Sequence, residues 1–199
     1  MVELSKVKRG QVFSMAEHEW IVVEHNEEDG TTLVTTTDCI SDMAFDENNS
    51  NDFRNSSLRK YLNSDFLEEL LDGGLEIDDV MYTDFDLTGH QGGDYGICRD
   101  LIGLLTEDQY KEHKDILVID DWWWLITPSS GHSCAVRGVS SGGSLGSGIA
   151  YSLLDYGSLG VRPALTLDSE AVVAIEEAHK SLEDYSSEEL LQELLRREN

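Results

Sequence analysis

The sequence predicts an α+β fold, and three observations support this class. Short runs near the start of the chain alternate apolar and polar residues between turn residues, which is typical of antiparallel strands. Apolar residues then recur at helical spacing in the second quarter of the chain. Beyond residue 128, Gly- and Ser-rich stretches separate short apolar runs, which indicates strands joined by loops.

The N-terminal part is expected to form a small antiparallel sheet. Strands are predicted over residues 11–15, 20–24 and 32–36, and Asp29-Gly30 between the last two is a strong hairpin signal. Residues 42–52 are rich in Asp and Asn, whose side chains compete for backbone hydrogen bonds, so a loop is expected there.

Short helices are expected next. One follows Ser57, and Ser64 can cap a second one that Asp72-Gly73-Gly74 ends. Residues 76–100 are expected to be irregular or extended, and Thr106 opens a capping-box pattern for a helix over 106–113. The inward side of the second helix is expected to carry Phe66, Leu67, Leu70 and Leu71.

The aromatic run over residues 122–126 is expected in the middle of the core, because each buried Trp removes a large apolar area from water. Alternation over 161–167 predicts a strand with Pro163 at an edge or bulge. The domain is expected to cover residues 1–168. A C-terminal helical extension is expected over 169–199, with an apolar stripe formed by Val172, Val173, Ile175 and Ala178.

The charge is extreme, with 40 Asp and Glu against 14 Lys and Arg and a net charge of −26. Such a surface repels nucleic acid and anionic membranes and attracts cationic partners. The sequence therefore predicts a basic protein partner and neither direct nucleic-acid binding nor membrane binding. Adaptation to high salt and simple solubility remain alternatives. The expected acidic face comprises Glu24, Glu27, Glu28, Asp29, Asp42, Asp46, Glu47, Asp78, Asp79, Asp84 and Asp86.

No cofactor, metal site or catalytic centre is expected. Residues 142–146 match G-x-S-x-G, but no helix follows, so a flexible turn is expected. Residues 84–89 resemble the start of a calcium loop, yet Tyr95 stands where a bidentate Glu is required. No His has a partner at zinc spacing. The cysteines are Cys39, Cys98 and Cys134; their odd number and the absence of a signal peptide or long apolar run favour a reduced, cytoplasmic setting.

Three segments carry a resemblance to a known family. Residues 121–128 read D-W-W-W-L-I-T-P, residues 160–165 read G-V-R-P-A-L, and residues 56–63 read S-S-L-R-K-Y-L-N ahead of Phe66-Leu67. Together they resemble domain of unknown function 6273, a bacterial and phage family whose members show W-W-L-R-S-P followed by G-V-R-P-A-L. The resemblance spans about residues 11–167. Ile126 stands where the family usually has Arg, so a polar network built on that Arg is not expected.

The resemblance implies a C-type-lectin-like fold, similar to formylglycine-generating enzymes and to the variable proteins of diversity-generating retroelements. A twisted antiparallel sheet with two flanking helices would support a long irregular loop region. By analogy, residues 131–156 would face a ligand. The family offers no catalytic residues to carry over, and the calcium signatures of lectins are missing. The expected ligand-facing residues are His132, Arg137, Ser140, Ser141, Ser144, Tyr151 and Tyr156.

The leading functional prediction is a non-enzymatic protein-binding module in the cytoplasm of a bacterial host cell. Its sharper form is a phage-type inhibitor that mimics nucleic acid and blocks the basic groove of a host or defence protein of the restriction or CRISPR type. One alternative is a lectin-like domain that binds a small ligand or glycan by stacking on Tyr151, Tyr156 and the Trp run. Another is an oxidoreductase related to formylglycine-generating enzymes that uses Cys98 and Cys134.

Overall fold

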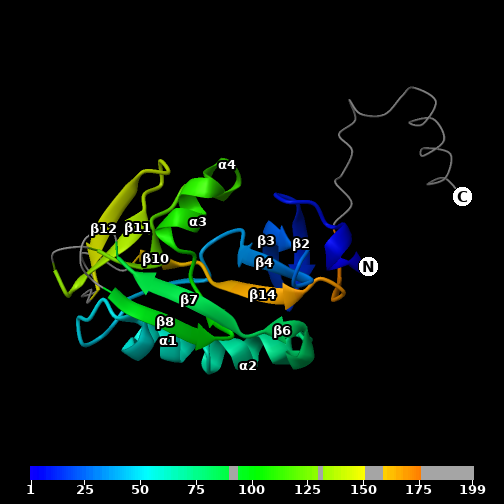
Figure 1. Cartoon of the computed structure of the whole chain (residues 1–199), viewed down its shortest axis with the longest axis horizontal. Coiled ribbons are helices and arrows are strands. Elements are labelled where there is room, and N and C mark those ends of the chain that lie inside the picture. Colours follow the sequence, from blue (N-terminus) through cyan, green and yellow to red (C-terminus); the bar gives the residue numbers. More distant parts are fainter. Residues whose placement is uncertain (90–93, 130–131, 151–158, 176–199) are drawn as a thin grey trace, which may run out of the picture.

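The computed structural model describes residues 1–89, 94–129, 132–150 and 159–175. In these residues the chain is mixed α+β, mostly antiparallel sheet with a few short helices, as predicted. One sheet has six strands in the order β2-β3-β4-β14-β6, with β9 also paired to β14, and another has five in the order β12-β11-β10-β13-β5. Two-stranded pairs join β1 to β15 and β7 to β8. Figure 1 shows α1 and α2 below the sheets and α3 and α4 above them.

The strands are β1 (Val2–Glu3), β2 (Val12–Met15), β3 (His18–Asn26), β4 (Thr31–Thr36), β5 (Ser41–Met43), β6 (Val80–Met81), β7 (Thr83–Thr88), β8 (Asp94–Asp100), β9 (Ile102–Gly103), β10 (Trp123–Pro128), β11 (Ala135–Val139), β12 (Leu145–Ile149), β13 (Leu159–Val161), β14 (Ala164–Asp168) and β15 (Val172–Val173). The helices are α1 (Ser57–Leu62), α2 (Asp65–Asp72), α3 (Glu107–Glu112) and α4 (Lys114–Leu117). Single 3-10 turns are η1 (Leu4–Lys6), η2 (Phe53–Asn55) and η3 (Ile77–Asp79).

The predicted N-terminal strands are confirmed as β2, β3 and β4, which pair in antiparallel fashion. Gly30 closes the β3–β4 turn at φ +66°, a backbone conformation that glycine adopts without steric strain. The predicted helix pair is confirmed as α1 and α2, and Gly73 ends α2. Phe66 and Leu70 are fully buried on its inner side, whereas Leu71 is 37% exposed.

Helix capping follows the sequence only in part. At α3, Thr106 and Gln109 form the predicted capping box, with the Thr106 Oγ1 accepting from the Gln109 N–H at 3.1 Å. Ser64 precedes α2 as predicted, but it is not a cap. Its hydroxyl donates to the Lys60 carbonyl at 2.6 Å instead, so it serves the end of α1.

Two predictions of local structure are wrong, and tertiary pairing explains both. The acidic loop begins with β5, because Ser41–Met43 pairs with β13. Residues 76–100, predicted to be irregular or extended, are extended in β6 and in the antiparallel pair β7–β8, whose register shifts between Asp86 and Thr88. Val172–Val173 is strand β15 on β1, so the chain is not helical from residue 169 to residue 175. The rest of the predicted extension, including Ala178, lies outside the described residues.

Strand β10 explains the aromatic run. All six of its residues are buried, because it separates two apolar clusters. Trp124 and Ile126 belong to the larger cluster, and Trp123 and Leu125 belong to the smaller one. The alternation of side chains along a strand therefore requires apolar residues at every position. Trp122 precedes the strand and is 50% exposed, so the prediction that the whole run is buried is wrong for this residue.

Candidate functional site

The G-V-R-P-A-L segment has a structural role. Arg162 is 1% exposed and donates to the backbone carbonyls of Thr36 and Leu117, each at 2.6 Å. Its guanidinium lies 5.0 Å from the centre of the Trp123 ring, a cation–π geometry. Burial lowers the pKa of Arg162 to about 10, which leaves it protonated at neutral pH. All of these contacts are internal, so Arg162 joins β4, α4 and β10.

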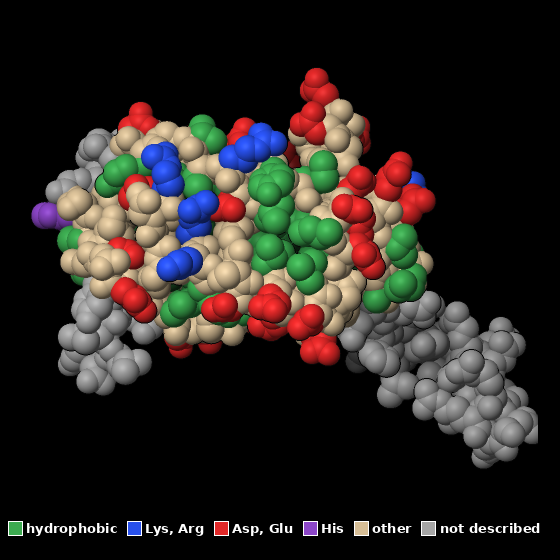
Figure 2. Space-filling model, turned by 90° about the horizontal axis from the view of Figure 1, so that it is seen from below, with side chains coloured by type: hydrophobic (Ala, Val, Ile, Leu, Met, Phe, Trp, Pro, Cys, Tyr) green, Lys and Arg blue, Asp and Glu red, His purple; other side chains and the backbone are tan. Residues whose placement is uncertain are grey.

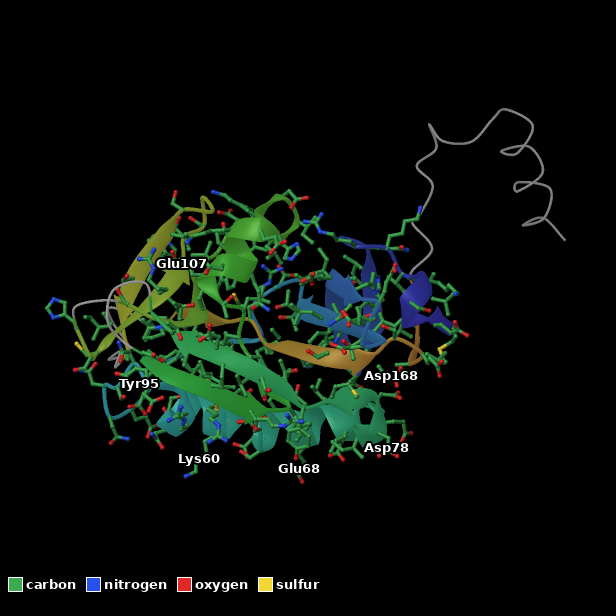
Figure 3. The ribbon with its side chains drawn as sticks, viewed as in Figure 1. Lys60, Glu68, Asp78, Tyr95, Glu107 and Asp168 are labelled. Carbon is green, nitrogen blue, oxygen red and sulfur yellow. The ribbon has the colours of Figure 1, made fainter. Side chains whose placement is uncertain are left out.

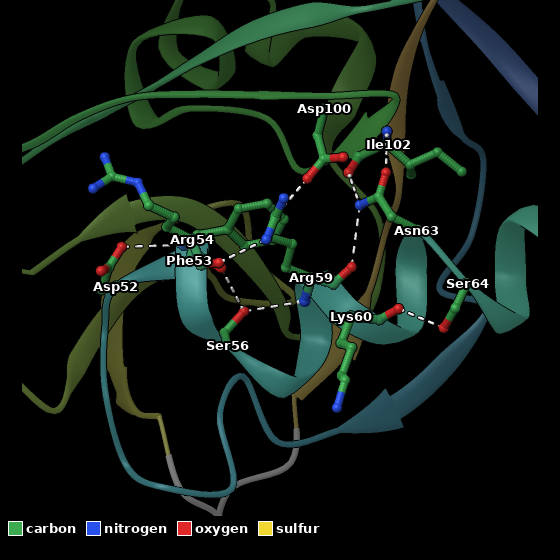
Figure 4. A network of polar contacts seen from close by, with 10 residues as sticks. All are labelled: Asp52, Phe53, Arg54, Ser56, Arg59, Lys60, Asn63, Ser64, Asp100 and Ile102. Carbon is green, nitrogen blue, oxygen red and sulfur yellow. Dashed lines mark hydrogen bonds and ion pairs between the residues drawn. The ribbon is translucent and has the colours of Figure 1, made fainter.

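The segment over residues 56–63 is also structural (Figure 4). The Ser56 hydroxyl accepts from the Arg59 N–H at 3.0 Å and donates to the Phe53 carbonyl at 2.9 Å, which caps α1. Arg59 forms an ion pair with Asp100 of β8. Asn63 bonds both backbone groups of Ile102, accepting from its N–H at 3.0 Å and donating to its carbonyl at 2.8 Å. These polar side chains attach α1 to neighbouring strands rather than facing a ligand.

Carboxylates from separate parts of the chain gather at one end of the six-stranded sheet. Thr31 pairs with both Asn26 and Asp168, and Val80 pairs with Leu167. This register aligns the β3–β4 turn, the end of β14 and the start of β6. Figure 3 shows Asp78 and Asp168 on this side of the molecule. We call this group the acidic sheet end; it comprises Glu3, Glu27, Glu28, Asp29, Asp78, Asp79, Asp168 and Glu170.

A pocket of about 700 Å³ lies at the acidic sheet end. Glu3, Glu27, Asp29, Asp168 and Glu170 contribute five carboxylates to its lining, and Lys6 is the only Lys or Arg among the lining residues. Sequence analysis found the residues of the β3–β4 turn but missed Glu3, Asp168 and Glu170. The end of β14 reaches this site because β14 pairs with β4, and no local sequence pattern predicts that pairing.

The electrostatics of Asp79 reflect this crowding. Partial burial raises its pKa, and the negative charges of Asp168, Glu76 and Asp78 raise it further. Like charges close together disfavour ionisation of each other. Asp79 therefore links the η3 turn electrostatically to the end of β14, and a cationic partner at this surface would relieve the repulsion.

The remaining residues of the predicted acidic face lie elsewhere. Asp42 and Glu47 are exposed near β5, and Asp84 and Asp86 are exposed on β7. Asp84 already faces Arg99 at 3.5 Å. Glu24 is exposed on β3 and lines a second pocket of about 550 Å³ beside the acidic sheet end.

Asp46 is a correction to the predicted face, because it is 1% exposed. Its carboxylate accepts from the backbone N–H of Ser50 at 2.9 Å and of Ser57 at 3.1 Å. Such bonds stabilise a buried carboxylate, and they fix the loop that leads into α1. Asp46 is therefore a structural residue.

The carboxylates do not cover the molecule evenly. Figure 2 shows the face that carries α1 and α2, with Lys and Arg side chains on one side and apolar side chains in the middle. Asp and Glu side chains are densest toward the end of the molecule where Figure 3 labels Asp78. Lys60 of α1 is among the exposed basic residues on the lower side. On this face, acidic and basic side chains are therefore unevenly distributed.

Comparison with known families gives one match. Residues 82–169 match domain of unknown function 6273. The match includes the aromatic strand β10 and the Arg162 segment, whereas the α1 segment lies before it. Comparison with curated proteins and with solved structures gave no match to this chain.

The part that matches domain of unknown function 6273 contains the predicted ligand-facing loops. There, Arg137 of β11 forms an ion pair with Glu107 and donates to the Ser147 hydroxyl at 3.0 Å. Burial raises the pKa of Glu107, but hydrogen bonds from Lys111 and Arg137 outweigh it and hold the pKa below its usual value. Glu107 also lines a pocket of about 350 Å³ that includes Asp86 and Thr106.

The other predicted loop residues are more dispersed. His132 is exposed, and its carbonyl accepts from Asn51 at 3.0 Å. The Ser140 hydroxyl accepts from the Ser144 N–H at 3.0 Å and shapes the β11–β12 turn, which includes Ser141. This turn is the G-x-S-x-G match, and no helix follows it up to residue 150. Tyr151 and Tyr156 lie outside the described residues.

The thiols and possible metal ligands offer little chemistry. Burial raises the pKa of Cys39 to about 12 and also raises that of Cys98, so both thiols stay protonated at neutral pH. Within the described ranges, no group of three or more His, Cys, Asp or Glu side chains is arranged to hold a metal ion. In the same part of the chain, no helix combines the length and apolar character that crossing a bilayer requires.

Proposed function

We propose that this protein is a non-enzymatic binding module that docks its acidic sheet end onto a basic surface of a partner protein. One observation carries the proposal. Strand register brings carboxylates of the β3–β4 turn, the end of β14 and the residues before β6 to a single end of the sheet, beside a pocket lined by five carboxylates and one lysine. Complementary charge of this kind speeds association and selects partners.

The partner class that fits best is a nucleic-acid-binding protein of a host or of a defence system. Such proteins carry Lys and Arg grooves that neutralise phosphates. Carboxylates of the acidic sheet end would occupy the phosphate positions, as in a phage-type inhibitor. The net charge of −26 opposes direct binding of nucleic acid. It therefore favours a chain that takes the place of nucleic acid on the partner over a chain that binds the partner and nucleic acid together. We also propose that the frame is C-type-lectin-like, in keeping with the family resemblance.

A matched pair of variants tests the location of the binding surface. Glu27→Gln with Asp168→Asn neutralises two carboxylates of the acidic sheet end, and Asp42→Asn with Glu47→Gln neutralises two exposed carboxylates near β5. The probe is a synthetic oligo-arginine peptide, titrated by calorimetry at low salt. We expect the first pair to weaken binding by about tenfold, a loss of about 1.4 kcal/mol, and the control pair to have little effect.

Three outcomes would contradict the proposal. Equal weakening by both pairs would mean that net charge alone drives binding. An affinity that does not fall with added salt would remove electrostatic docking altogether. For the mimicry form, the chain should displace a DNA duplex from a basic DNA-binding protein, and the first variant pair should displace it less well than the control pair. If the chain does not displace DNA, the mimicry form of the proposal is contradicted, but docking onto a basic protein surface is not.

A further inference from the structure

The outer edge of β12 pairs with no other strand in the described part of the chain. β12 is the last strand of the five-stranded sheet and pairs with β11 in regular antiparallel register over all five residues. The Ala150 N–H donates to the Cys134 carbonyl at 2.7 Å, one step beyond the strand. Because bonded pairs alternate along an antiparallel ladder, Gly146 and Gly148 bond to β11.

The intervening residues of β12 therefore direct their backbone groups away from the sheet. These residues are Leu145, Ser147 and Ile149, and no described strand pairs with them on that side. The Ser147 side chain is held by Arg137 and by Ser129, at 3.0 and 2.9 Å, which leaves its backbone groups unobstructed by its own side chain. An edge of this kind is a template for another strand.

Natural proteins usually protect strand edges with charge, shortness or cover, and the edges of β5, β2 and β7 show such protection. β5 has three residues and carries Asp42. β2 is covered by the residue after β15, because the Ser14 N–H donates to the Ala174 carbonyl at 2.7 Å. β7 carries Asp84 and Asp86. By contrast, residues 138–149 contain no charged residue and no proline.

The surroundings of β12 indicate the chemistry of an added strand. The Trp122 ring lies under Gly146, where an added Cβ would be 3.5 Å from it, and Trp122 is 50% exposed. Ile149 is 54% exposed at the other end of the strand. Both exposed side chains are apolar, and an added strand with apolar side chains would cover them.

We infer that the edge of β12 binds an extended, uncharged and apolar segment of another protein by strand addition. A second copy of this chain is a poor occupant, because two bodies of charge −26 repel each other. Figure 1 shows β12 at the opposite end of the molecule from the N-terminus and the end of β14. The inference therefore concerns a second surface and goes beyond the proposed function.

Ile149→Pro is the informative variant. The Ile149 N–H points outward, so proline there removes an outward donor without removing a bond to β11. Ile149→Thr is the matched control, since it also removes apolar side-chain area but keeps the N–H and a β-branched side chain. The probe is a phage-displayed library of random short peptides, selected on the wild-type chain. We expect selected peptides to bind Ile149→Pro about tenfold more weakly than Ile149→Thr, as loss of about one net hydrogen bond implies.

Hydrogen exchange on the wild-type chain provides a readout that needs no variant. The amides of Leu145, Ser147 and Ile149 should exchange at least about tenfold more slowly when a selected peptide is bound, while those of Gly146 and Gly148 change less. The inference is overturned if no peptide is selected, if selected peptides bind both variants equally, or if they slow none of these outward amides. Sedimentation that shows self-association of the wild-type chain, abolished by Ile149→Pro, would assign the edge to a second copy and overturn it too.

Discussion

Asp79 is the residue whose pKa reports the charge repulsion at the acidic sheet end. Its raised pKa means that the folded chain holds the Asp79 proton more tightly than the unfolded chain does. Stability is therefore greater at low pH and falls as the pH rises from the usual value of 3.8 through the raised folded value. Above that window, the ionised carboxylate destabilises the fold.

Asp79→Asn should accordingly stabilise the protein at neutral pH. We expect a gain of about 0.5 kcal/mol, or a rise in Tm of about 1–2 °C, because a partly exposed charge is well screened by solvent. The gain should vanish below about pH 3.8, where both states are protonated. Thermal unfolding followed by circular dichroism across this pH range measures it. Asp42→Asn is the control, and a pH profile indistinguishable from that of the control would refute repulsion by Asp168 and its neighbours.

Arg162 shows a different use of charge at the residue scale. A buried cation is expensive to desolvate, yet two carbonyl acceptors and the Trp123 ring compensate it. Its bonds reach Thr36 and Leu117, which are far from it in the sequence. The Arg162 segment of the family resemblance therefore reports on how β4, α4 and β10 are joined.

At the scale of elements, Asn63 is one of the side chains that attach α1 to the neighbouring strands. Asn63 satisfies both backbone groups of Ile102, a residue that is fully buried. Asn63→Ala should lower the free energy of unfolding by about 2–3 kcal/mol, because buried backbone groups would lose their partners. Chemical denaturation measures the loss. The control is Asn55→Ala, an exposed residue bonded to Asp52 at 3.0 Å, which should change stability by less than about 0.5 kcal/mol. Equal effects would show that the Asn63 bonds contribute little.

Local sequence signals predicted the elements whose structure is determined locally. The Asp29-Gly30 turn, the helix after Ser56 and the Thr106 capping box all form as expected. Strand β15 was missed because its partner β1 lies far away in the sequence. The β7–β8 pair was predicted only as irregular or extended chain, although buried Phe85 and Leu87 alternate with exposed Asp84 and Asp86 on β7. The aromatic run over residues 122–126 was predicted to lie in the core, but neither the strand β10 that it forms nor its position between two apolar clusters was predicted.

The candidate site was only half predictable for the same reason. The acidic turn at Glu27–Asp29 is continuous in sequence and was expected. Asp78 and Asp79 were expected on the same acidic face, whereas Glu3 and Asp168 were not, because only strand pairing brings them to this end. Asp46 shows the reverse case, since a carboxylate in an acidic run is buried by hydrogen bonds to backbone N–H groups. Composition predicts the sign of the surface charge, but it does not predict which carboxylates are exposed.

At the scale of the whole molecule, one charge distribution has opposite effects on folding and on binding. A net charge of −26 destabilises the compact state by self-repulsion and attracts a basic partner over long range. Added salt shortens the Debye length from about 30 Å at 0.01 M to about 3 Å at 1 M, and so it weakens both effects. Folding should become more favourable as binding becomes less favourable.

We therefore expect the Tm to rise by several degrees between about 0.01 M and 0.3 M NaCl and then to level off, while affinity for the oligo-arginine probe falls steeply over the same range. Scanning calorimetry and binding titrations in identical buffers measure the two curves, and KCl in place of NaCl controls for specific ion effects. A Tm that keeps rising into molar salt, with binding insensitive to salt, would indicate adaptation to a saline environment instead. A Tm that does not change with salt would mean that repulsion between the carboxylates is too weak to affect stability, because nearby cations or long distances already reduce it. Electrostatic docking through the acidic sheet end would then lose its support.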